Sequence, residues 1–134
     1  MVDLLASQIW KFDLPQNSVL VPIPLHKNRK NWRGFNQAEI LAKTLAKKFN
    51  VNCSESLIRI METKTQVGLT KEERKKNVRG AFAVRKAWDK ARIRDKNIIL
   101  VDDVYTSGAT MQEAAKVLKR AGAKSVWGMT VALG

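Results

Sequence analysis

The stretch Ile98-Ile99-Leu100-Val101-Asp102-Asp103-Val104-Tyr105-Thr106-Ser107-Gly108-Ala109-Thr110 decides the fold. Four branched apolar residues lead directly into two carboxylates, and a turn with hydroxyl groups and one glycine follows. Thr110 and Glu113 then fit a capping box, the pattern that opens a helix. This order predicts a buried parallel strand, a tight anion-binding loop and a helix N-terminus.

The same stretch predicts a ligand-binding site. In open α/β sheets, ligands bind beyond the carboxyl ends of the strands, where Asp102 and Asp103 are expected. Neighbouring strand residues point to opposite faces, so the two acids can address sugar hydroxyls or a metal ion from two directions. The loop offers hydroxyls and backbone N–H groups to a phosphate. A sugar phosphate fits this pattern, and the alternative is a solvated Asp-Asp turn.

Other phosphate-binding classes are excluded by their missing motifs. The chain contains neither G-x-x-x-x-G-K-[ST] nor G-x-G-x-x-G. A phosphoacceptor receiver domain would carry its paired acids near the first strand, whereas here they stand at positions 102 and 103 of 134.

Composition indicates one globular domain over residues 1–134, of which 45% are hydrophobic. No apolar run is long enough to cross a membrane, so we expect no membrane insertion. Cys53 is the only cysteine, which excludes an internal disulfide and makes a cytoplasmic protein the default expectation. The net charge of +13 favours anionic partners such as pyrophosphate, nucleotides or nucleic acid, or else serves solubility.

The first half of the chain predicts a strand, a basic loop and a helix. Residues 1–17 are expected to form a covering segment with a short amphipathic helix. Residues 18–24 read as a strand that ends at two prolines. A run of cations without any acid follows and suits a diphosphate. Residues 36–50 predict a helix with Asn36 as N-cap and an apolar stripe made by Ile40, Leu41, Leu45 and Phe49.

The second half continues the alternation of strands and helices. We expect a short strand over 56–60, then a flexible loop over 61–80 that holds a charged helix opened by the capping box of Thr70 and Glu73. Such a segment is either a solvated surface or a lid that excludes water. A strand over 80–84, a surface connection over 85–96, a helix from Thr110 to Ala121 stopped by Gly122, and a buried strand over 125–132 follow. The expected fold class is α/β, an open and mainly parallel sheet with helices on both faces.

Several motifs resemble a known family. The stretch 98–110 is similar to the phosphoribosyl-pyrophosphate-binding motif of type I phosphoribosyltransferases. The motifs Val21-Pro-Ile-Pro-Leu-His26 and Arg33-Gly-Phe-Asn-Gln37 narrow the resemblance to the ComF type (competence protein F), as do residues 64–82. ComF-type proteins commonly carry a zinc-binding, cysteine-rich segment ahead of this domain. With Cys53 alone, we expect this chain to lack that segment or to have been cut away from it.

The resemblance implies the type I phosphoribosyltransferase fold and transfer of phosphoribose from phosphoribosyl pyrophosphate to a nitrogen nucleophile, with Mg²⁺ bridging pyrophosphate and ribose. It implies catalytic roles for Asp102, Asp103, Lys64 and Arg33, with Mg²⁺ held through the substrate and by the two acids. The implied 5′-phosphate loop comprises Val104, Tyr105, Thr106, Ser107, Gly108, Ala109 and Thr110. The implied pyrophosphate-binding residues are Leu25, His26, Lys27, Arg29 and Arg33.

Three hypotheses about function stay open from the sequence. The chain is a phosphoribosyltransferase with an unknown acceptor, or an accessory module in DNA uptake and competence that contacts single-stranded DNA or uptake-machinery proteins. The third hypothesis is a nucleotide-responsive regulator in which the ligand orders residues 61–80. The acceptor and the oligomeric state, including a homodimer, are left open.

Overall fold

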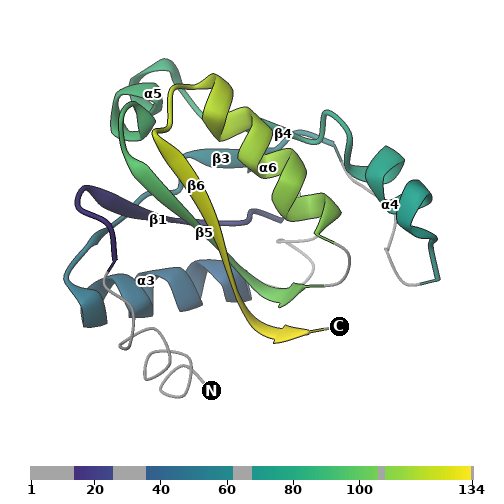
Figure 1. The fold of residues 1–134 in the computed structure, drawn as a ribbon, viewed down its shortest axis with the longest axis horizontal. Helices are drawn as coiled ribbons and strands as arrows, with labels where there is room; N and C mark the ends of the chain where they lie inside the picture. Colours follow the sequence, from purple (N-terminus) through teal and green to yellow (C-terminus); the bar gives the residue numbers. More distant parts are fainter. Residues whose placement is uncertain (1–13, 26–35, 62–67, 106–107, 134) are drawn as a thin grey trace.

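A computed structural model of the chain describes residues 14–25, 36–61, 68–105 and 108–133, with the backbone alone at 87–89, 103–105 and 131–133. Strands and helices alternate along this chain (Figure 1). Their order is β1 (Ser18–Pro22), α3 (Gln37–Phe49), β2 (Asn52–Cys53), β3 (Leu57–Arg59), α4 (Lys71–Val78), β4 (Phe82–Val84), α5 (Ala87–Ile93), β5 (Asn97–Tyr105), α6 (Ala109–Arg120) and β6 (Ser125–Leu133).

The central sheet is parallel throughout and has the strand order β2-β1-β5-β6. β5 is an interior strand, since it pairs with β1 from Ser18 opposite Asn97 to Pro22 opposite Val101, and with β6 on its other side. This position explains its run of branched apolar residues, because a parallel strand covered on both faces must be apolar on both. β3 and β4 form a separate antiparallel pair.

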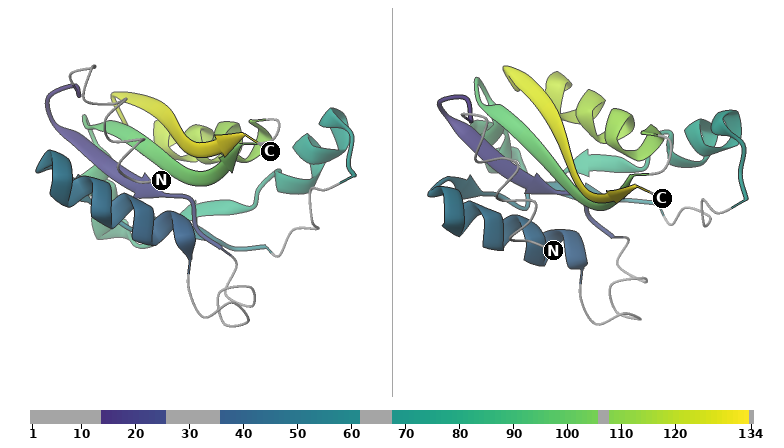
Figure 2. Two further views of the ribbon diagram at one scale, coloured as in Figure 1. Left: turned by 90° about the horizontal axis from the view of Figure 1, so that it is seen from below. Right: turned by 60° about the horizontal axis from the view of Figure 1, so that its bottom comes forward.

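Helices cover both faces of the sheet (Figure 2). On one face, α3 packs Leu41 and Leu45 against Leu20, Ile99 and Val101. On the opposite face lies a second buried cluster to which α6, α5, β3 and β4 all contribute, and its largest members are Leu57, Ile93, Ile98, Leu100 and Leu118. Each of these side chains contributes about 1.5–3 kcal/mol by leaving water. The expected α/β architecture with helices on both faces is therefore confirmed.

Helix α3 begins and ends as its sequence predicts. The Asn36 side chain accepts a hydrogen bond from the Ala38 backbone N–H, and Asn50 ends the helix in the left-handed conformation. The predicted stripe is wrong at one residue, because Ile40 is 54% exposed. Alanines at 38, 42 and 46 are buried beside Leu41 and Leu45, so the buried face is rotated away from Ile40.

Two further expectations differ from the structure. The segment 85–96 is not merely a surface connection, because it contains α5, whose last residue Ile93 is fully buried in the core. The last strand is only partly buried: within the described sheet β6 is an edge strand, and Trp127 on it is 57% exposed. In the first segment one buried residue departs from the character of its neighbours, whereas in β6 all the described side chains are half-buried or exposed.

The remaining expectations fall at element boundaries or outside the described residues. The strands expected over 56–60 and 80–84 are the shorter β3 and β4. The expected helix in 1–17 lies almost wholly outside the described residues, although Leu14 packs against the α3 side of the core. No helix in the described part of the chain combines the length and apolar character that crossing a membrane requires.

Candidate functional site

The carboxyl ends of β1 and β5 meet at one edge of the sheet. Pro22 pairs with Val101, and the Ile23 backbone N–H donates to the Val101 carbonyl at 2.8 Å. From this point, the segment after β1 continues into Leu25 and the predicted pyrophosphate residues. β5 continues into Asp102 and Asp103. The structure thus brings the beginnings of the two predicted half-sites together, although they are about 80 residues apart in sequence.

The two acids lie inside β5 rather than beyond its end, which corrects the sequence expectation. Asp102 is opposite Thr130 of β6, and the pairing continues through Val104 and Tyr105. β5 is therefore longer than its apolar run because β6 pairs with its polar end. Alternation along β5 puts Asp102 on the α6 side of the sheet with Ile98 and Leu100, and its side chain is half-buried. The Asp103 side chain lies outside the described residues.

Helix α6 begins at Ala109, four residues after the last residue of β5. Its N-cap is Gly108 with φ of +79°, a left-handed conformation that glycine adopts without strain. The predicted N-cap Thr110 is wrong, because Thr110 is the second residue of the helix. The predicted capping partner Glu113 instead accepts a hydrogen bond from the Gly80 backbone N–H at 3.1 Å and pairs with Lys116 at 3.7 Å.

The N-terminus of α6 suits an anion. No side chain of its N-cap residue closes it, and no acid stands in its first turn. The aligned peptide dipoles place about half a positive charge at such an end, where the first backbone N–H groups point outward. Asp102 stands on the neighbouring strand, on the α6 side of the sheet. The predicted phosphate-binding helix start and the predicted ribose-binding acid are thus next to each other, and their roles stay predictions.

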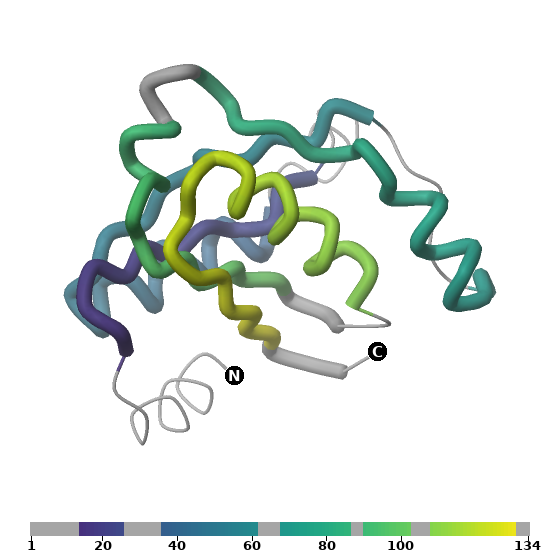
Figure 3. Tube along the Cα trace, turned by 45° about the horizontal axis from the view of Figure 1, so that its top comes forward, coloured from purple at the N-terminus to yellow at the C-terminus, as the bar shows by residue number. Residues whose placement is uncertain are grey.

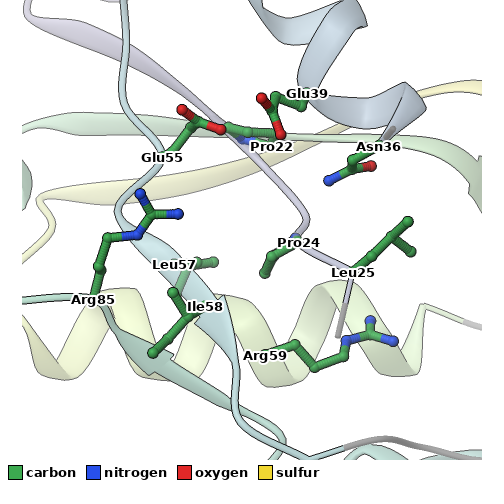
Figure 4. Close-up of a pocket in the computed structure, with 10 residues that line it drawn as sticks. All are labelled: Pro22, Pro24, Leu25, Asn36, Glu39, Glu55, Leu57, Ile58, Arg59 and Arg85. Atoms are coloured by element: carbon green, nitrogen blue, oxygen red, sulfur yellow. The ribbon is translucent and has the colours of Figure 1, made fainter. Parts of the chain in front are cut away.

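A pocket of about 320 Å³ lies beside the end of β1 (Figure 4). Pro22, Pro24 and Leu25 form one wall, and β3 forms another. Figure 4 shows the carboxylates of Glu39 and Glu55 near each other, with Arg59 at the far end. Among the described residues, no lining residue comes from β5 or α6. The pocket is therefore on the side of β1 that is away from Asp102, next to the start of the predicted pyrophosphate loop.

The charged residues of this pocket are held by specific contacts. Lys43 bridges Glu39 at 3.1 Å and Glu55 at 3.8 Å. These two carboxylates raise the pKa of the Lys43 ammonium, mainly because Lys43 Nζ donates a hydrogen bond to Glu39. The Arg59 guanidinium lies over the Phe82 ring, 4.8 Å from its centroid. The carboxyl groups are therefore partly neutralised, while Arg59 is positioned by an aromatic ring.

Sequence reasoning gave no role to Glu39, Glu55, Arg59 or Arg85. Arg59 and Arg85 line the same pocket because β3 and β4 pair: Arg59 is opposite Phe82, and the Arg85 backbone N–H donates to the Ser56 carbonyl at 2.8 Å. The available signal was an arginine directly after the apolar pair Leu57 and Ile58. Nothing in the sequence connects it with Glu39, which comes from α3 and meets it only in the folded chain.

Cys53 does not supply a nucleophile. Burial, followed by the nearby Glu55 carboxylate, raises the pKa of the Cys53 thiol, so that the group stays protonated at neutral pH.

Several predicted site residues lie outside the described residues. These are Thr106 and Ser107 of the phosphate loop, His26, Lys27, Arg29 and Arg33 of the pyrophosphate loop, and Lys64. Their roles stay predictions. Of the expected loop 61–80, the structure describes the charged helix: Thr70 caps α4 and accepts from the Glu73 backbone N–H at 3.2 Å, as predicted, and Val78 is buried. Figure 1 shows that α4 projects beyond the N-terminal end of α6.

The donor set near the site suits a metal ion held chiefly by its substrate. Within the described residues, no group of three or more His, Cys, Asp and Glu side chains gathers at one point. Asp102 and Asp103, adjacent in β5, are the last carboxylates before the α6 N-terminus in the sequence. Oxygen ligands of this kind, few in number, fit Mg²⁺ bound to phosphates, which keeps waters and needs one or two carboxylates.

Comparison with solved structures shows where this fold occurs. The chain is similar to "the allosteric regulatory enzyme of purine biosynthesis" (TM-score 0.61, 17% identity, covering 97% of this chain and 25% of the other). It is also similar to a purine phosphoribosyltransferase from Pyrococcus horikoshii (TM-score 0.53, 15% identity, covering 98% and 68%). At these identities the likeness establishes the fold.

Comparison with curated proteins and family models concerns the sequence itself. The chain is 33% identical to Competence protein F of Haemophilus influenzae over 127 residues, and this match covers 92% of the chain and 54% of the relative. It is 39% identical to Competence protein ComFC of Bacillus subtilis over 104 residues, covering 78% and 39%. The chain thus spans about half the length, or less, of these relatives. Residues 34–133 match the model of the phosphoribosyl transferase domain. The chain therefore belongs to the phosphoribosyltransferase domain family and is of the ComF type.

Proposed function

We propose that the chain binds phosphoribosyl pyrophosphate at the carboxyl edge of the sheet and transfers phosphoribose to a nitrogen nucleophile, releasing pyrophosphate. The observation that carries this proposal is the α6 N-terminus, which has a glycine N-cap and no first-turn acid, directly after the strand that bears Asp102 and Asp103. The resemblance of residues 98–110 to the family's donor-binding motif supports the same assignment.

Each part of the site takes one part of the donor. Gly108, Ala109 and Thr110 bind the 5′-phosphate through the N–H groups of the helix start. Asp102 and Asp103 hold the ribose hydroxyls. Leu25, His26, Lys27, Arg29 and Arg33 surround the pyrophosphate, and Arg59 beside Leu25 adds a cation near that loop.

The reaction breaks the bond between the anomeric carbon and the pyrophosphate oxygen and forms a bond from that carbon to nitrogen, which loses a proton. As in glycoside chemistry, the anomeric carbon becomes oxocarbenium-like, so the acids act on charge and position rather than as nucleophiles. Bound Mg²⁺ supplies neutralisation of the departing pyrophosphate. Lys64, Arg33 and closure of residues 61–80 over the substrate complete the proposed site and exclude water.

Calorimetric titration with phosphoribosyl pyrophosphate and Mg²⁺, followed by a pyrophosphate-release assay with a panel of nucleobases, tests this function. We expect binding, and Mg²⁺-dependent release with at least one base that is lost in Asp103→Asn. Binding without release for any base would reject catalysis and favour the regulator, in which the ligand only protects residues 61–80 from protease. Absence of binding would reject the donor site itself.

A second candidate function concerns DNA. The relatives include Competence protein F of Haemophilus influenzae and, at 34% identity over 127 residues, the DNA utilization protein YhgH of Salmonella typhimurium. The net charge of +13 favours an anionic partner of this kind. We propose that the chain, acting in the cytoplasm, contributes to the uptake or use of DNA, either by contacting single-stranded DNA or by contacting the proteins that handle it.

A further inference from the structure

Cations gather at the end of the molecule opposite the phosphoribosyl site. Two turns meet there, since the Asp95 backbone N–H donates to the Gly122 carbonyl at 2.9 Å and the Lys124 N–H donates to the Lys96 carbonyl at 2.8 Å. Figures 1 and 3 show α5 and the C-terminal end of α6 together at this end, far from α4. We call the following residues of the two turns and of the end of α6 the basic pole: Arg94, Lys96, Lys119, Arg120 and Lys124.

Helix stability explains only part of this charge. Lys119 and Arg120 stand in the last turn of α6, where cations offset the negative end of the helix dipole. Lys119 also donates its Nζ to the Lys124 carbonyl at 3.2 Å. Arg94, Lys96 and Lys124 lie outside that helix, and within the described part of the chain no member of the basic pole forms an ion pair. The cations are therefore available to an external anion.

An exposed aromatic ring stands beside the basic pole. Trp127 follows Lys124 by three residues on β6, which is about 10 Å along a strand. Its indole Nε1 donates to Ser125 Oγ at 3.0 Å, and Ser125 Oγ donates to Asn97 Oδ1 at 2.6 Å, so the indole is tied to the sheet. At 57% exposure, more than half of this large apolar residue stays in contact with water. Its placement suits a flat ligand.

A groove continues the basic pole on the other side. It encloses about 510 Å³ between α5 and the end of the sheet formed by β2, and its lining includes Lys96, Arg92, Asn52 and Ser54. Lys96 belongs to both the groove and the basic pole. The cations of the groove therefore continue into the basic pole through Lys96. Lys124 of the pole precedes Trp127 by three residues in the sequence.

We infer that the basic pole and Trp127 bind single-stranded nucleic acid, with phosphates on the cations and an unstacked base on the indole. A cationic track with an interspersed aromatic ring is how proteins hold single strands, because every base offers a face to stack. In a duplex the base faces are stacked on each other and cannot reach Trp127. An acidic protein would bind the cations but offers no base to stack on the indole ring. The inference rests on the second candidate function for its class of partner and is independent of the phosphoribosyl site.

The test measures binding of a labelled twenty-residue oligothymidylate by fluorescence anisotropy across a series of salt concentrations. In Arg120→Gln/Lys124→Gln we expect the slope of log affinity against log salt to become shallower by about 1.4, because each single-strand phosphate contact contributes about 0.7. In Trp127→Ala we expect affinity to fall about tenfold at fixed salt with an unchanged slope. Trp127→Phe should restore most of the affinity.

The matched control is Lys75→Gln/Lys76→Gln in α4, which removes the same charge at the opposite end of the molecule. Equal losses in the control and the pole variant would show binding by net charge alone and overturn the inference. So would competition by phosphoribosyl pyrophosphate, or tighter binding of polyglutamate or of vesicles with anionic lipids than of the oligonucleotide. If the protein binds no oligonucleotide, the inference fails together with the direct DNA contact in the second candidate function. Contact with DNA-handling proteins and the phosphoribosyl proposal are then unaffected, and the latter keeps its own calorimetric test.

Discussion

Helices α4 and α6 pack against each other, yet their N-termini are built differently. α4 begins at Thr70, whose side chain caps the Glu73 N–H, and Glu72 and Glu73 stand in its first turn. α6 begins at Gly108, which has no side chain to offer, and its first turn holds no acid. Within the described residues, a cap side chain and two acids thus complement the positive end of α4, whereas the N-cap of α6 has no side chain and its first turn has no acid.

This difference teaches how a binding site can be recognised without a ligand. A helix start that serves only the fold is normally closed by its own cap, because a cap contributes about 1 kcal/mol to stability. An N-terminus that omits this contribution, next to a strand with paired acids, is where we propose that the phosphate binds. α3 is a second closed example, with Asn36 as its cap and Glu39 in its first turn.

The largest expected effect is on the chemistry beside the open helix. Asp102→Asn removes a charge that holds ribose and metal without changing size, and we expect the rate of pyrophosphate release to fall about 100- to 1,000-fold. Single-turnover rates at saturating donor measure this. A rate within threefold of wild type would remove Asp102 from the site. Asp95→Asn, at the opposite end of the molecule, is the control and should keep its full rate.

The second prediction makes α6 resemble α4. Thr110→Glu puts a carboxylate at the position that Glu72 occupies in α4. The acid complements the helix dipole, so we expect the free energy of unfolding to rise by about 0.3–1 kcal/mol. It also repels a bound phosphate, and we expect affinity for phosphoribosyl pyrophosphate to fall roughly 100-fold, from unit charges about 6 Å apart at an effective dielectric constant of about 20.

The control for this change is Thr110→Gln, which has the same size without the charge. Calorimetry and thermal unfolding of the two variants separate charge from shape. Equal donor affinity in the two variants would contradict an anion site at this helix.

The third prediction concerns the backbone that leaves α6 open. Gly108 has φ of +79°, so Gly108→Ala should lower the free energy of unfolding by about 1–2 kcal/mol and also weaken donor binding. Gly68→Ala is a matched control, because Gly68 has φ of +80° and an added Cβ would meet no atom within 4 Å. We expect similar destabilisation of both variants and weaker binding in Gly108→Ala alone. Unchanged donor affinity in both variants would show that the backbone turn at Gly108 does not contribute to the donor site.

The smallest effect is expected at the closed helix. Thr70→Ala removes the cap of α4 and should cost about 1 kcal/mol locally, seen as faster amide exchange in residues 71–78. Affinity for ribose 5-phosphate should stay unchanged, since the 5′-phosphate binds at α6. Thr44→Ala on the exposed side of α3 serves as the control. A loss of ribose 5-phosphate binding in Thr70→Ala would place part of the phosphate site on α4.

The fold could be predicted because its strongest signals are local. The apolar run of β5 is buried on both faces. Asn36 and Thr70 are N-caps, which act through hydrogen bonds to residues two or three positions ahead. The sequence does not predict α5, because Ile93 is the one residue of this charged segment that the structure shows buried in the core. The N-cap of α6 was misplaced because Thr110 and Glu113 fit a capping box, while the pairing of Glu113 with Gly80 depends on a contact across 33 residues.

The candidate site could be predicted only where it follows the chain. Asp102 to Thr110 is one continuous segment, so its order of acids, loop and helix is visible in the sequence. The pocket beside β1 joins Glu39, Glu55, Arg59 and Arg85, which come from different elements. Their meeting depends on the parallel pairing of β1 with β2 and on the separate pairing of β3 with β4, and no short-range rule specifies both.

The most direct test of the open N-terminus of α6 is a titration of ¹⁵N-labelled protein with ribose 5-phosphate, followed by amide chemical shifts. We predict that the amides of Gly108, Ala109 and Thr110 shift with a common saturation, while the amides of Ala38 and Glu73, which donate to the cap side chains of α3 and α4, stay in place. Saturable shifts at Ala38 or Glu73 with none at Gly108 to Thr110 would contradict the assignment of the phosphate to α6.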